Sequence, residues 1–202
     1  MKVYAHYGHR DFILALGYKG EMIKQYFLNW RNYVSDFTLE TKSHEIVFHN
    51  NDMDDFRITF AETGAESLTG ERVRRLRKYI GDEDFMVTYG DGVSDINIPA
   101  LVDFHTRQGT IATMTGVQPT HRFGLLDIDP ATEKLRGFYQ HKVTEEKDGK
   151  SHDFINGGFM VFQKEALDYF DNGMMECAFI KLAEEKSLSA YQHDGFWRAM
   201  DT

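Results

Sequence analysis

The sequence contains a single cysteine in 202 residues, so no intramolecular disulfide can form. We expect that residue, Cys177, to be a small buried side chain on a helix rather than a nucleophile, because free cysteine packs like a small hydrophobe. Proline is also scarce, at three residues, and no low-complexity linker divides the chain. These absences exclude a disulfide-stabilised secreted fold and favour a single domain over residues 1–202.

Positive charge is in the minority, since Lys and Arg total 23 against 32 Asp and Glu, a formal charge of −9. Neutralising nucleic-acid phosphates needs clustered cations, so we expect no nucleic-acid partner. The apolar runs are too short to cross a bilayer and the N-terminus carries no secretion signal, so we expect no membrane partner and a cytoplasmic protein. Hydrophobic residues, at 42%, still allow a sizeable core.

Three common motifs are missing as well: G-x-G-x-x-G, the P-loop and G-x-S-x-G. What the chain does contain is an alternation of apolar strands and amphipathic helices. Strands are expected at 12–16, 84–89, 111–117, 125–129, 135–139, 154–163 and 188–193, and helices at 21–34, after Thr69, and at 99–108, 164–172 and 175–186. This alternation predicts an α/β fold with three layers and a mixed, mainly parallel sheet.

Residues 36–61 depart from the alternation, because three segments with strand character follow one another there. The polar tract 50–55 lies between the second and the third, so we expect it to be a hairpin loop. An antiparallel excursion is therefore predicted to interrupt the βα units.

Asp91 is the first candidate for chemistry, in the Tyr-Gly-Asp-Gly turn that ends the strand at 84–89. Ligands of open α/β sheets bind beyond the carboxyl ends of the strands, and a carboxylate there suits Mg²⁺. The alternative is a turn aspartate that accepts hydrogen bonds from nearby backbone N–H groups. The pattern alone leaves both interpretations open.

Three further features are weaker alone. The stretch from Thr63 to Gly70 places small residues at a helix N-terminus, with Thr69 as the expected N-cap, a position that attracts anions or polar base edges. The basic run 72–78 that follows is expected to be a solvated helix face. Glycines at 157–158 interrupt a strand, which often marks close approach by a ligand.

Taken in order, the motifs resemble the sugar-phosphate nucleotidyltransferases, and within them the glucose-1-phosphate cytidylyltransferases. The segments that carry the resemblance are Asp11-Phe-Ile…Gly17-Tyr18-Lys19-Gly20, Thr63-Gly64-x-x-Ser67-x-Thr69-Gly70-x-Arg72, Thr88-Tyr-Gly-Asp91-Gly-Val-x-Asp95, Arg122-Phe-Gly124-x-Leu-Asp-Ile, Ile155-Asn-Gly-Gly158-Phe and Gly195-Phe-Trp197-x-x-Met-Asp201-Thr. They span nearly the whole chain. The resemblance implies a Rossmann-like sheet of the nucleotide-diphospho-sugar transferase type.

The same resemblance implies an activity: CTP and glucose 1-phosphate would give CDP-glucose and pyrophosphate, for nucleotide-sugar and polysaccharide biosynthesis. Asp91 and Asp201 match the family's catalytic Mg²⁺ carboxylates. The residues that match its nucleotide side are Gly17, Tyr18, Thr69, Gly70, Tyr89 and Gly90, and those that match its sugar-phosphate side are Gly124, Lys142, Asn156, Gly157 and Trp197. The complete protein would be a homo-oligomer.

Three departures from the family pattern stand out. The first strand and the G-G-x-G-T-R phosphate loop are missing from this sequence, since Met1 aligns inside the helix that follows them. The family's Glu-Lys-Pro is replaced at 140–142, which leaves Lys142 or His141 as the group for the sugar phosphate. Glu71 stands where a second glycine is usual, which leaves the choice of base open.

We therefore expect a domain that is incomplete at both ends, poorly soluble and without activity as an isolated polypeptide. In this fold the missing strand lies in mid-sheet, so its neighbours would have unpaired backbone groups. Two alternatives to the cytidylyltransferase remain: a nucleotidyltransferase for another nucleotide or sugar phosphate, and a non-catalytic homologue that binds a nucleotide sugar.

Overall fold

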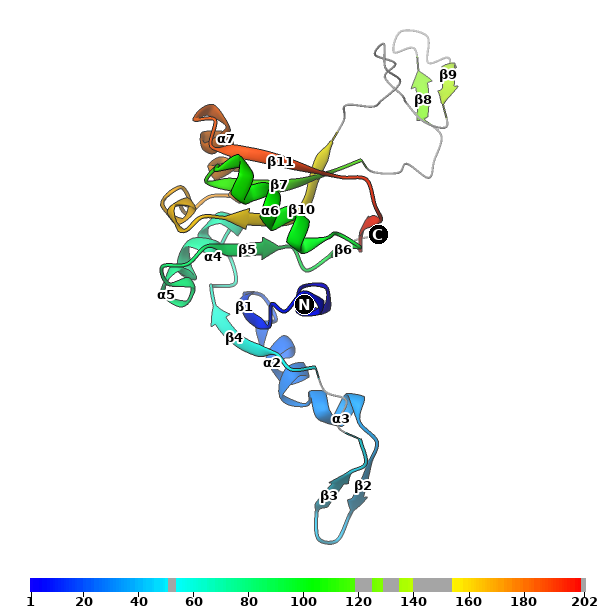
Figure 1. Ribbon diagram of the computed structural model, residues 1–202. Coiled ribbons are helices and arrows are strands. Elements are labelled where there is room, and N and C mark those ends of the chain that lie inside the picture. Colours follow the sequence, from blue (N-terminus) through cyan, green and yellow to red (C-terminus); the bar gives the residue numbers. More distant parts are fainter. Residues whose placement is uncertain (51–53, 119–124, 129–134, 140–153, 201–202) are drawn as a thin grey trace. The chain divides into compact units, whose positions relative to one another are not determined.

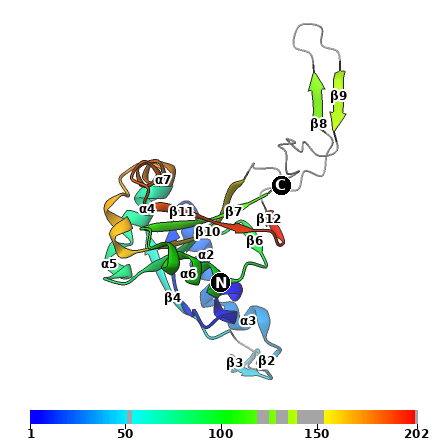
Figure 2. The ribbon, with the colours of Figure 1, turned by 45° about the horizontal axis from the view of Figure 1, so that its top comes forward.

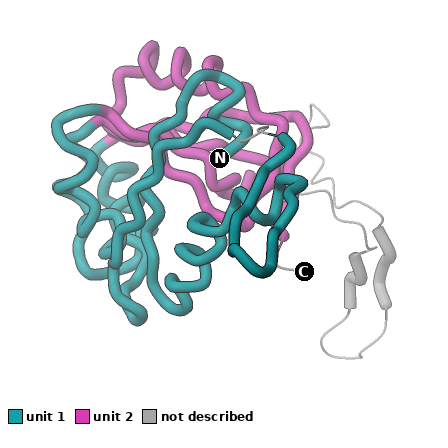
Figure 3. The backbone as a smooth tube through the Cα atoms, turned by 90° about the horizontal axis from the view of Figure 1, so that it is seen from below, with its two compact units in different colours: residues 1–83, 164–185 teal, residues 84–163, 186–202 magenta. Residues whose placement is uncertain are grey.

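The computed structural model describes residues 1–50, 54–118, 125–128, 135–139 and 154–200. They form two compact units, residues 1–83 with 164–185 and residues 84–163 with 186–202, here called unit 1 and unit 2 (Figure 3). Both are mixtures of helices and strands, as the expected α/β class requires. No helix in the described ranges has the length and apolarity needed to cross a membrane.

Unit 1 is built around a parallel pair of strands. Its elements are α1 (Lys2–His6), β1 (Asp11–Leu16), α2 (Gly20–Leu28), α3 (Trp30–Val34), β2 (Phe37–Glu40), β3 (Glu45–Phe48), β4 (Arg57–Glu62), α4 (Thr69–Arg75), α5 (Arg77–Ile80), the 3-10 helix η1 (Lys164–Asp168) and α7 (Met175–Glu184). β1 and β4 run parallel from the pair Asp11–Arg57 to the pair Leu16–Glu62. Aromatic rings pack α2 and α3 against this strand pair. The ring centre of Phe27 on α2 lies 5.6 Å from that of Phe60 on β4, and the ring centre of Trp30 on α3 lies 5.9 Å from that of Phe56, just before β4.

The antiparallel excursion exists, but its hairpin was predicted in the wrong place. β2 pairs with β3, from Phe37–Phe48 to Glu40–Glu45, so the turn lies at 41–44 and not at 50–55. β4 instead joins β1 in parallel. Figure 1 shows the hairpin leaving the end of α3. Both 41–44 and 50–55 are polar, so composition alone could not choose which of them holds the turn.

Three other local predictions for unit 1 were wrong. The helix expected over 21–34 is divided at Asn29 into α2 and α3. Thr69 is not the N-cap of α4, since Leu68 holds that position, and the Thr69 hydroxyl instead accepts a 3.0 Å hydrogen bond from the Met175 N–H at the start of α7. Cys177 does lie on a helix, α7, but it is exposed rather than buried.

Gly70 lets α4 approach the segment before α7. The N–H groups of Gly70 and Glu71 both donate to the Gly173 carbonyl, at 3.0 and 3.2 Å. A Cβ added at Gly70 would lie 2.7 Å from that carbonyl oxygen and 3.0 Å from the Met174 oxygen. Only glycine fits this contact without moving backbone atoms.

Unit 2 contains a mixed four-stranded sheet. Its elements are β5 (Phe85–Thr88), β6 (Gly92–Ser94), α6 (Ile98–Gln108), β7 (Ala112–Val117), β8 (Leu125–Ile128), β9 (Leu135–Tyr139), β10 (Ile155–Phe162), β11 (Leu188–His193) and β12 (Trp197–Ala199). The order is β11-β7-β10-β5, with β10 antiparallel to both neighbours and β11 parallel to β7. β8 pairs with β9, and the short strands β6 and β12, which the sequence did not predict, pair with each other (Figure 2).

The core of unit 2 lies between α6 and this sheet. Ile98 and Leu101 on α6 and Met160 and Phe162 on β10 are each at most 1% exposed. The Asn97 side chain caps α6 by accepting a 3.0 Å hydrogen bond from the Ala100 N–H, and Gly109 ends it with a φ of 63°. Pro99 and Gly109 predicted this helix correctly.

β1 and β5 are both edge strands. Within the ranges that the structure describes, β1 pairs with β4 alone and β5 pairs with β10 alone. Each therefore has a row of backbone groups without a partner strand, which is a known route to aggregation. Poor solubility of the isolated polypeptide stays a prediction with this physical basis.

His105 on α6 gives unit 2 a pH-dependent stability. The side chain is 5% exposed, Nδ1 lies 2.8 Å from the Thr113 hydroxyl, and Nε2 has no hydrogen-bond partner among the described residues. Burial lowers the pKa of His105, and the negative charge of Asp84 offsets this in part. In the unfolded chain His105 has an ordinary pKa of about 6.5. As the pH falls, the unfolded chain therefore binds a proton at His105 more readily than the folded unit does.

We predict that the free energy of unfolding falls as the pH drops from 7.5 to 5.5, because the stabilisation present above the unfolded pKa is lost toward the lower folded pKa. Urea titrations at both pH values measure this. His105→Asn, which keeps a group at the Nδ1 position but does not titrate, should reduce the slope. His9→Asn on the exposed surface should retain it. An unchanged slope in His105→Asn would contradict the assignment.

Gly70→Ala is predicted to destabilise unit 1 by about 2 kcal/mol, the usual cost of overpacking, because its Cβ would press on two backbone carbonyl groups. Urea unfolding of the purified chain measures the loss. Gly90→Ala is the control, since a Cβ there meets no atom within 4 Å; it should change stability by less than about 1 kcal/mol. Equal effects of the two substitutions would disprove the packing explanation.

Candidate functional site

The candidate residues that the structure describes fall into two sets, one in each unit. Unit 1 holds Gly17, Tyr18, Thr69 and Gly70, and unit 2 holds Tyr89, Gly90, Asp91, Asn156, Gly157 and Trp197. Gly124, Lys142 and Asp201 lie outside the described residues, as does His141.

In unit 1, the carboxyl ends of β1 and β4 are tied together by Thr63. Its N–H and its hydroxyl both donate to the Leu16 carbonyl, at 2.8 and 2.7 Å, and its side chain is fully buried. The two loops that follow these strands therefore start from one fixed point. This is the end of a parallel strand pair where α/β proteins place their ligands.

Arg72 extends this connection; the sequence placed it in the motif that begins at Thr63 but gave it no role of its own. Its guanidinium donates to the Thr63 hydroxyl at 2.7 Å and to the Ala65 carbonyl at 3.2 Å. The same group packs against Gly17, where an added Cβ would lie 2.7 Å from the guanidinium carbon. A Cβ at position 17 would therefore have to displace this guanidinium, which is the far end of a long side chain.

The basic run 72–78 is not simply a solvated face. Arg75 donates to the Thr63 carbonyl at 2.7 Å and pairs with Glu71 at 2.6 Å. Arg74 donates to Asn172, and Arg77 pairs with Asp168. The spacing of three between Arg72 and Arg75, which puts both on one face of a helix, was the signal in the sequence.

Tyr18 and Lys19 have an unusual local geometry. Tyr18 is 76% exposed, and Lys19 adopts the left-handed conformation with a φ of 56°, which non-glycine residues seldom adopt. The Lys19 ammonium lies 5.3 Å from the Tyr18 ring centre. An exposed ring at the end of β1 is free to stack on a flat ligand.

Thr69 and Gly70 are already engaged within unit 1. The Gly70 N–H is bound to Gly173 and the Thr69 hydroxyl to the Met175 N–H. These groups join α4 to α7, so a ligand at this turn would meet other atoms of the loop.

In unit 2, Asp91 occupies the turn between β5 and β6. The residue is exposed, and its carboxylate receives no hydrogen bond from any residue that the structure describes. Its backbone carbonyl accepts a 2.7 Å hydrogen bond from the Met200 N–H. Among the described residues the carboxylate is therefore not a turn cap, and the Met200 backbone lies beside the Asp91 backbone.

Trp197 is held next to the glycines of β10. Its indole Nε1 donates to the Gly157 carbonyl at 2.7 Å, and β12 pairs with β6 so that Trp197 faces Ser94 and Ala199 faces Gly92. Asp91, Gly157 and Trp197 are thus brought together in unit 2.

The glycines of β10 serve close contacts with the protein itself. A Cβ on Gly157 would lie 2.8 Å from Val117, and one on Gly158, whose φ is 78°, would lie 2.7 Å from the Tyr89 ring. The Asn156 side chain accepts a 2.9 Å hydrogen bond from the Gly158 N–H. The ladder between β10 and β7 shifts register here, which exposes the Gly157 carbonyl to Trp197.

Asp91 fits a magnesium site of the phosphate-bound kind. No cluster of three or more His, Cys, Asp or Glu side chains occurs in the described part of the chain, so an all-protein cage is not formed there. Mg²⁺ with phosphate ligands needs only one or two carboxylates. A free carboxylate at a strand end, on a residue whose backbone carbonyl accepts a hydrogen bond from the Met200 N–H, meets that requirement.

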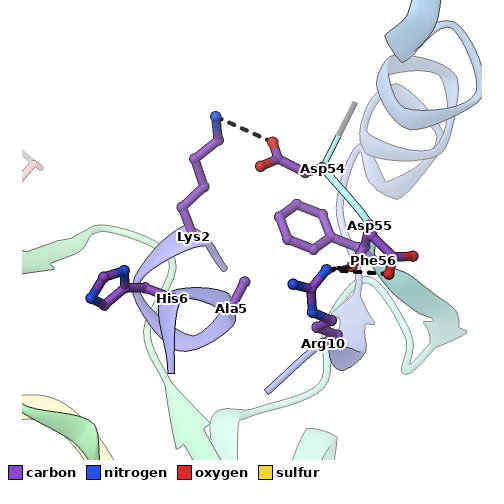
Figure 4. A pocket seen from close by; sticks show the side chains of 7 residues that line it. All are labelled: Lys2, Ala5, His6, Arg10, Asp54, Asp55 and Phe56. Atoms are coloured by element: carbon purple, nitrogen blue, oxygen red, sulfur yellow. Dashed lines mark hydrogen bonds and ion pairs between the residues drawn. The ribbon is translucent and has the colours of Figure 1, made fainter. Parts of the chain in front are cut away.

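A separate pocket in unit 1 lies at the opposite end of β1 and β4. It has a volume of about 380 Å³ and is lined by Lys2, Ala5, His6, Arg10, Asp54, Asp55 and Phe56 (Figure 4). Lys2 pairs with Asp54 and Arg10 with Asp55, each at 3.2 Å. Its cations are neutralised within the pocket, and none of the candidate residues lines it.

No protein-family model matches the chain. Known proteins do: a glucose-1-phosphate cytidylyltransferase from Salmonella typhi is 38% identical over the whole chain and 77% of that protein. A probable glucose-1-phosphate cytidylyltransferase from Bacillus subtilis is 39% identical with the same coverage.

Among solved structures, a UDP-glucose pyrophosphorylase from Acinetobacter baumanii superposes with a TM-score of 0.63 over 98% of this chain and 75% of that one. At 14% identity this likeness supports the nucleotidyltransferase fold alone. Identity above a third across the full chain decides the family, and the chain belongs to the glucose-1-phosphate cytidylyltransferases.

Proposed function

We propose that this chain forms part of an active site that converts CTP and glucose 1-phosphate into CDP-glucose and pyrophosphate. The observation that carries the proposal is the identity of 38–39% to glucose-1-phosphate cytidylyltransferases over the full chain. The free Asp91 carboxylate beside Gly157 and Trp197 gives unit 2 a chemically suitable site.

The reaction is a displacement at phosphorus. A phosphate oxygen of glucose 1-phosphate attacks the α-phosphorus of CTP, and the bond from that phosphorus to the α–β bridging oxygen breaks. Pyrophosphate leaves with the electron pair of the broken bond, so no oxidant or further reactant is needed. Catalysis then depends on positioning and on offsetting negative charge.

In this proposal Asp91 and Asp201 hold Mg²⁺, which supplies positive charge at the reacting phosphates. Trp197, Asn156, Gly157, Gly124 and Lys142 bind the sugar phosphate, and Gly17, Tyr18, Thr69, Gly70, Tyr89 and Gly90 bind the nucleotide. The exposed ring of Tyr18 supports its proposed role in binding the nucleotide. The hydrogen bond that holds the Trp197 indole in place supports its proposed role in binding the sugar phosphate. The working protein is proposed to be a cytoplasmic homo-oligomer.

One experiment tests both the nucleotide specificity and the activity of the 202-residue chain. It measures pyrophosphate release with glucose 1-phosphate and each of the four nucleoside triphosphates. We predict no CDP-glucose from the 202-residue chain alone, because its sequence contains no G-G-x-G-T-R loop. The same chain, extended at both ends with the flanking segments of the Bacillus subtilis relative and here called the extended chain, should turn over CTP.

Each alternative has its own outcome in that experiment. Preference for another triphosphate would point to a different nucleotidyltransferase, for which Glu71 in place of glycine is the motivating residue. Binding of ligands without turnover by the extended chain would favour a non-catalytic homologue. Robust turnover by the 202-residue chain would refute the requirement for the loop.

Asp91→Asn is predicted to lower the activity of the extended chain by at least about 100-fold, since removing a metal carboxylate costs several kcal/mol of charge stabilisation. Mn²⁺ binding, followed by electron paramagnetic resonance, should weaken in parallel. The unfolding free energy should change by less than about 0.5 kcal/mol, because no described group is bonded to this carboxylate. Asp103→Asn, exposed on α6, is the control and should behave as the parent.

A further inference from the structure

His193 lies at the end of β11 and contacts three oxygen atoms through one ring nitrogen. Its Nε2 is 3.1 Å from the Asp95 carboxylate, 3.1 Å from the Ser94 hydroxyl and 3.3 Å from the Phe196 carbonyl. The side chain is only 10% exposed. Neither the resemblance nor the proposed reaction gives this residue a role.

The chemistry of the partners fixes the proton on Nε2. The Phe196 carbonyl can only accept a hydrogen bond, so Nε2 donates to it, and Nε2 also lies 3.1 Å from the Asp95 carboxylate. The Ser94 hydroxyl oxygen also accepts a hydrogen bond from the Ile96 N–H, at 3.2 Å. Because serine and aspartate share one nitrogen, this is not a nucleophilic triad, in which they contact opposite nitrogens of the ring.

The turn after β11 is closely packed around the imidazole. A Cβ added at Gly195 would lie 2.5 Å from the Asp95 carboxylate oxygen and 2.6 Å from His193 Cε1. The Asp95 N–H also donates to the Phe196 carbonyl at 3.2 Å. His193 thus joins the residues after β6 to the residues before β12.

That junction is the base of the β6–β12 ribbon. From it the ribbon continues through the pair Trp197–Ser94 to the pair Ala199–Gly92, and it ends with the hydrogen bond from the Met200 N–H to the Asp91 carbonyl. Strands of three residues are too short to be stable alone. Their geometry must come from contacts such as those of His193.

We propose that His193 is a positioning residue that holds the β6–β12 ribbon closed, so that Asp91 and Trp197 keep the separation needed to bind metal and sugar phosphate together. The role assigned to these two residues rests on the proposed function. The closing of the ribbon itself is a structural property that can be measured without any substrate.

The first test uses the 202-residue chain in a Trp30→Phe background, which leaves Trp197 as the sole tryptophan. His193→Leu should shift the Trp197 emission to longer wavelength and speed hydrogen exchange of the Met200 amide by about tenfold, the loss expected for one hydrogen bond. His193→Gln, whose side-chain amide can donate in place of Nε2, should restore both. His9→Leu, on the exposed surface, is the control and should change neither.

Gly195→Ala provides an independent variant, because its Cβ would displace Asp95 and His193 without altering either side chain. It should reproduce the effects of His193→Leu, and the double variant should show little additional effect. Unchanged Met200 exchange and Trp197 emission in the folded variant, either His193→Leu or Gly195→Ala, would overturn the proposal.

The second test uses the extended chain. His193→Leu should raise the KM for glucose 1-phosphate and the half-saturating Mg²⁺ concentration about tenfold, with a smaller change in kcat at saturation, and His193→Gln should lie within about threefold of the parent. Equal loss in Leu and Gln variants, or a loss in kcat alone, would contradict positioning. If the extended parent makes no CDP-glucose, the proposed function fails while the exchange and emission tests still decide the role of His193.

Discussion

The hydrogen bond from the Trp197 indole to the Gly157 carbonyl is the interaction on which the candidate site of unit 2 depends. At 2.7 Å it joins the β6–β12 ribbon to β10, the strand that pairs with both β7 and β5. The carbonyl is accessible to the indole because β10 changes register at its glycines. An irregularity in a central strand therefore creates the contact that a regular ladder would have prevented.

Glycine has a different meaning in this protein from the one its sequence suggests. Gly17, Gly70, Gly157 and Gly158 all stand in motifs that a ligand would approach, yet each is in close contact with the protein's own atoms. Arg72 packs on Gly17, and the Gly173 carbonyl packs on Gly70. A glycine in such a motif thus indicates that another group packs closely against the backbone, but it does not show whether that group is a ligand or part of the protein.

The strands with continuous apolar runs, the capped helix α6 and the order of the motifs could be read from the sequence, because each depends on neighbouring residues. The β6–β12 ribbon could not, since strands of three residues have no detectable periodicity. The role of Thr69 and the clamp made by Arg72 were also missed. The Thr69 hydroxyl contacts Met175, 106 residues away, and the Arg72 guanidinium packs on Gly17 at the end of another strand, so neither contact is visible in a local stretch of sequence.

The exposure of Cys177 and the position of the hairpin illustrate a different limit. Composition predicted the class of structure at 36–61 correctly but could not choose between two turns of similar polarity. For Cys177, the average burial of cysteine was a poor guide to one position on α7. The position of the turn and the exposure of Cys177 both depend on how the rest of unit 1 packs, which local sequence does not determine.

The contact between Thr69 and Met175 has a consequence for synthesis, because it joins residues 106 positions apart. The first turn of α4 emerges from the ribosome early, but its partners at 173–175 follow only after the whole of β5 to β10. Chains fold as they are made, and contacts that close a long loop form slowly. Unit 1 therefore begins first and is completed late, and for much of translation its nascent strands must avoid association with other chains.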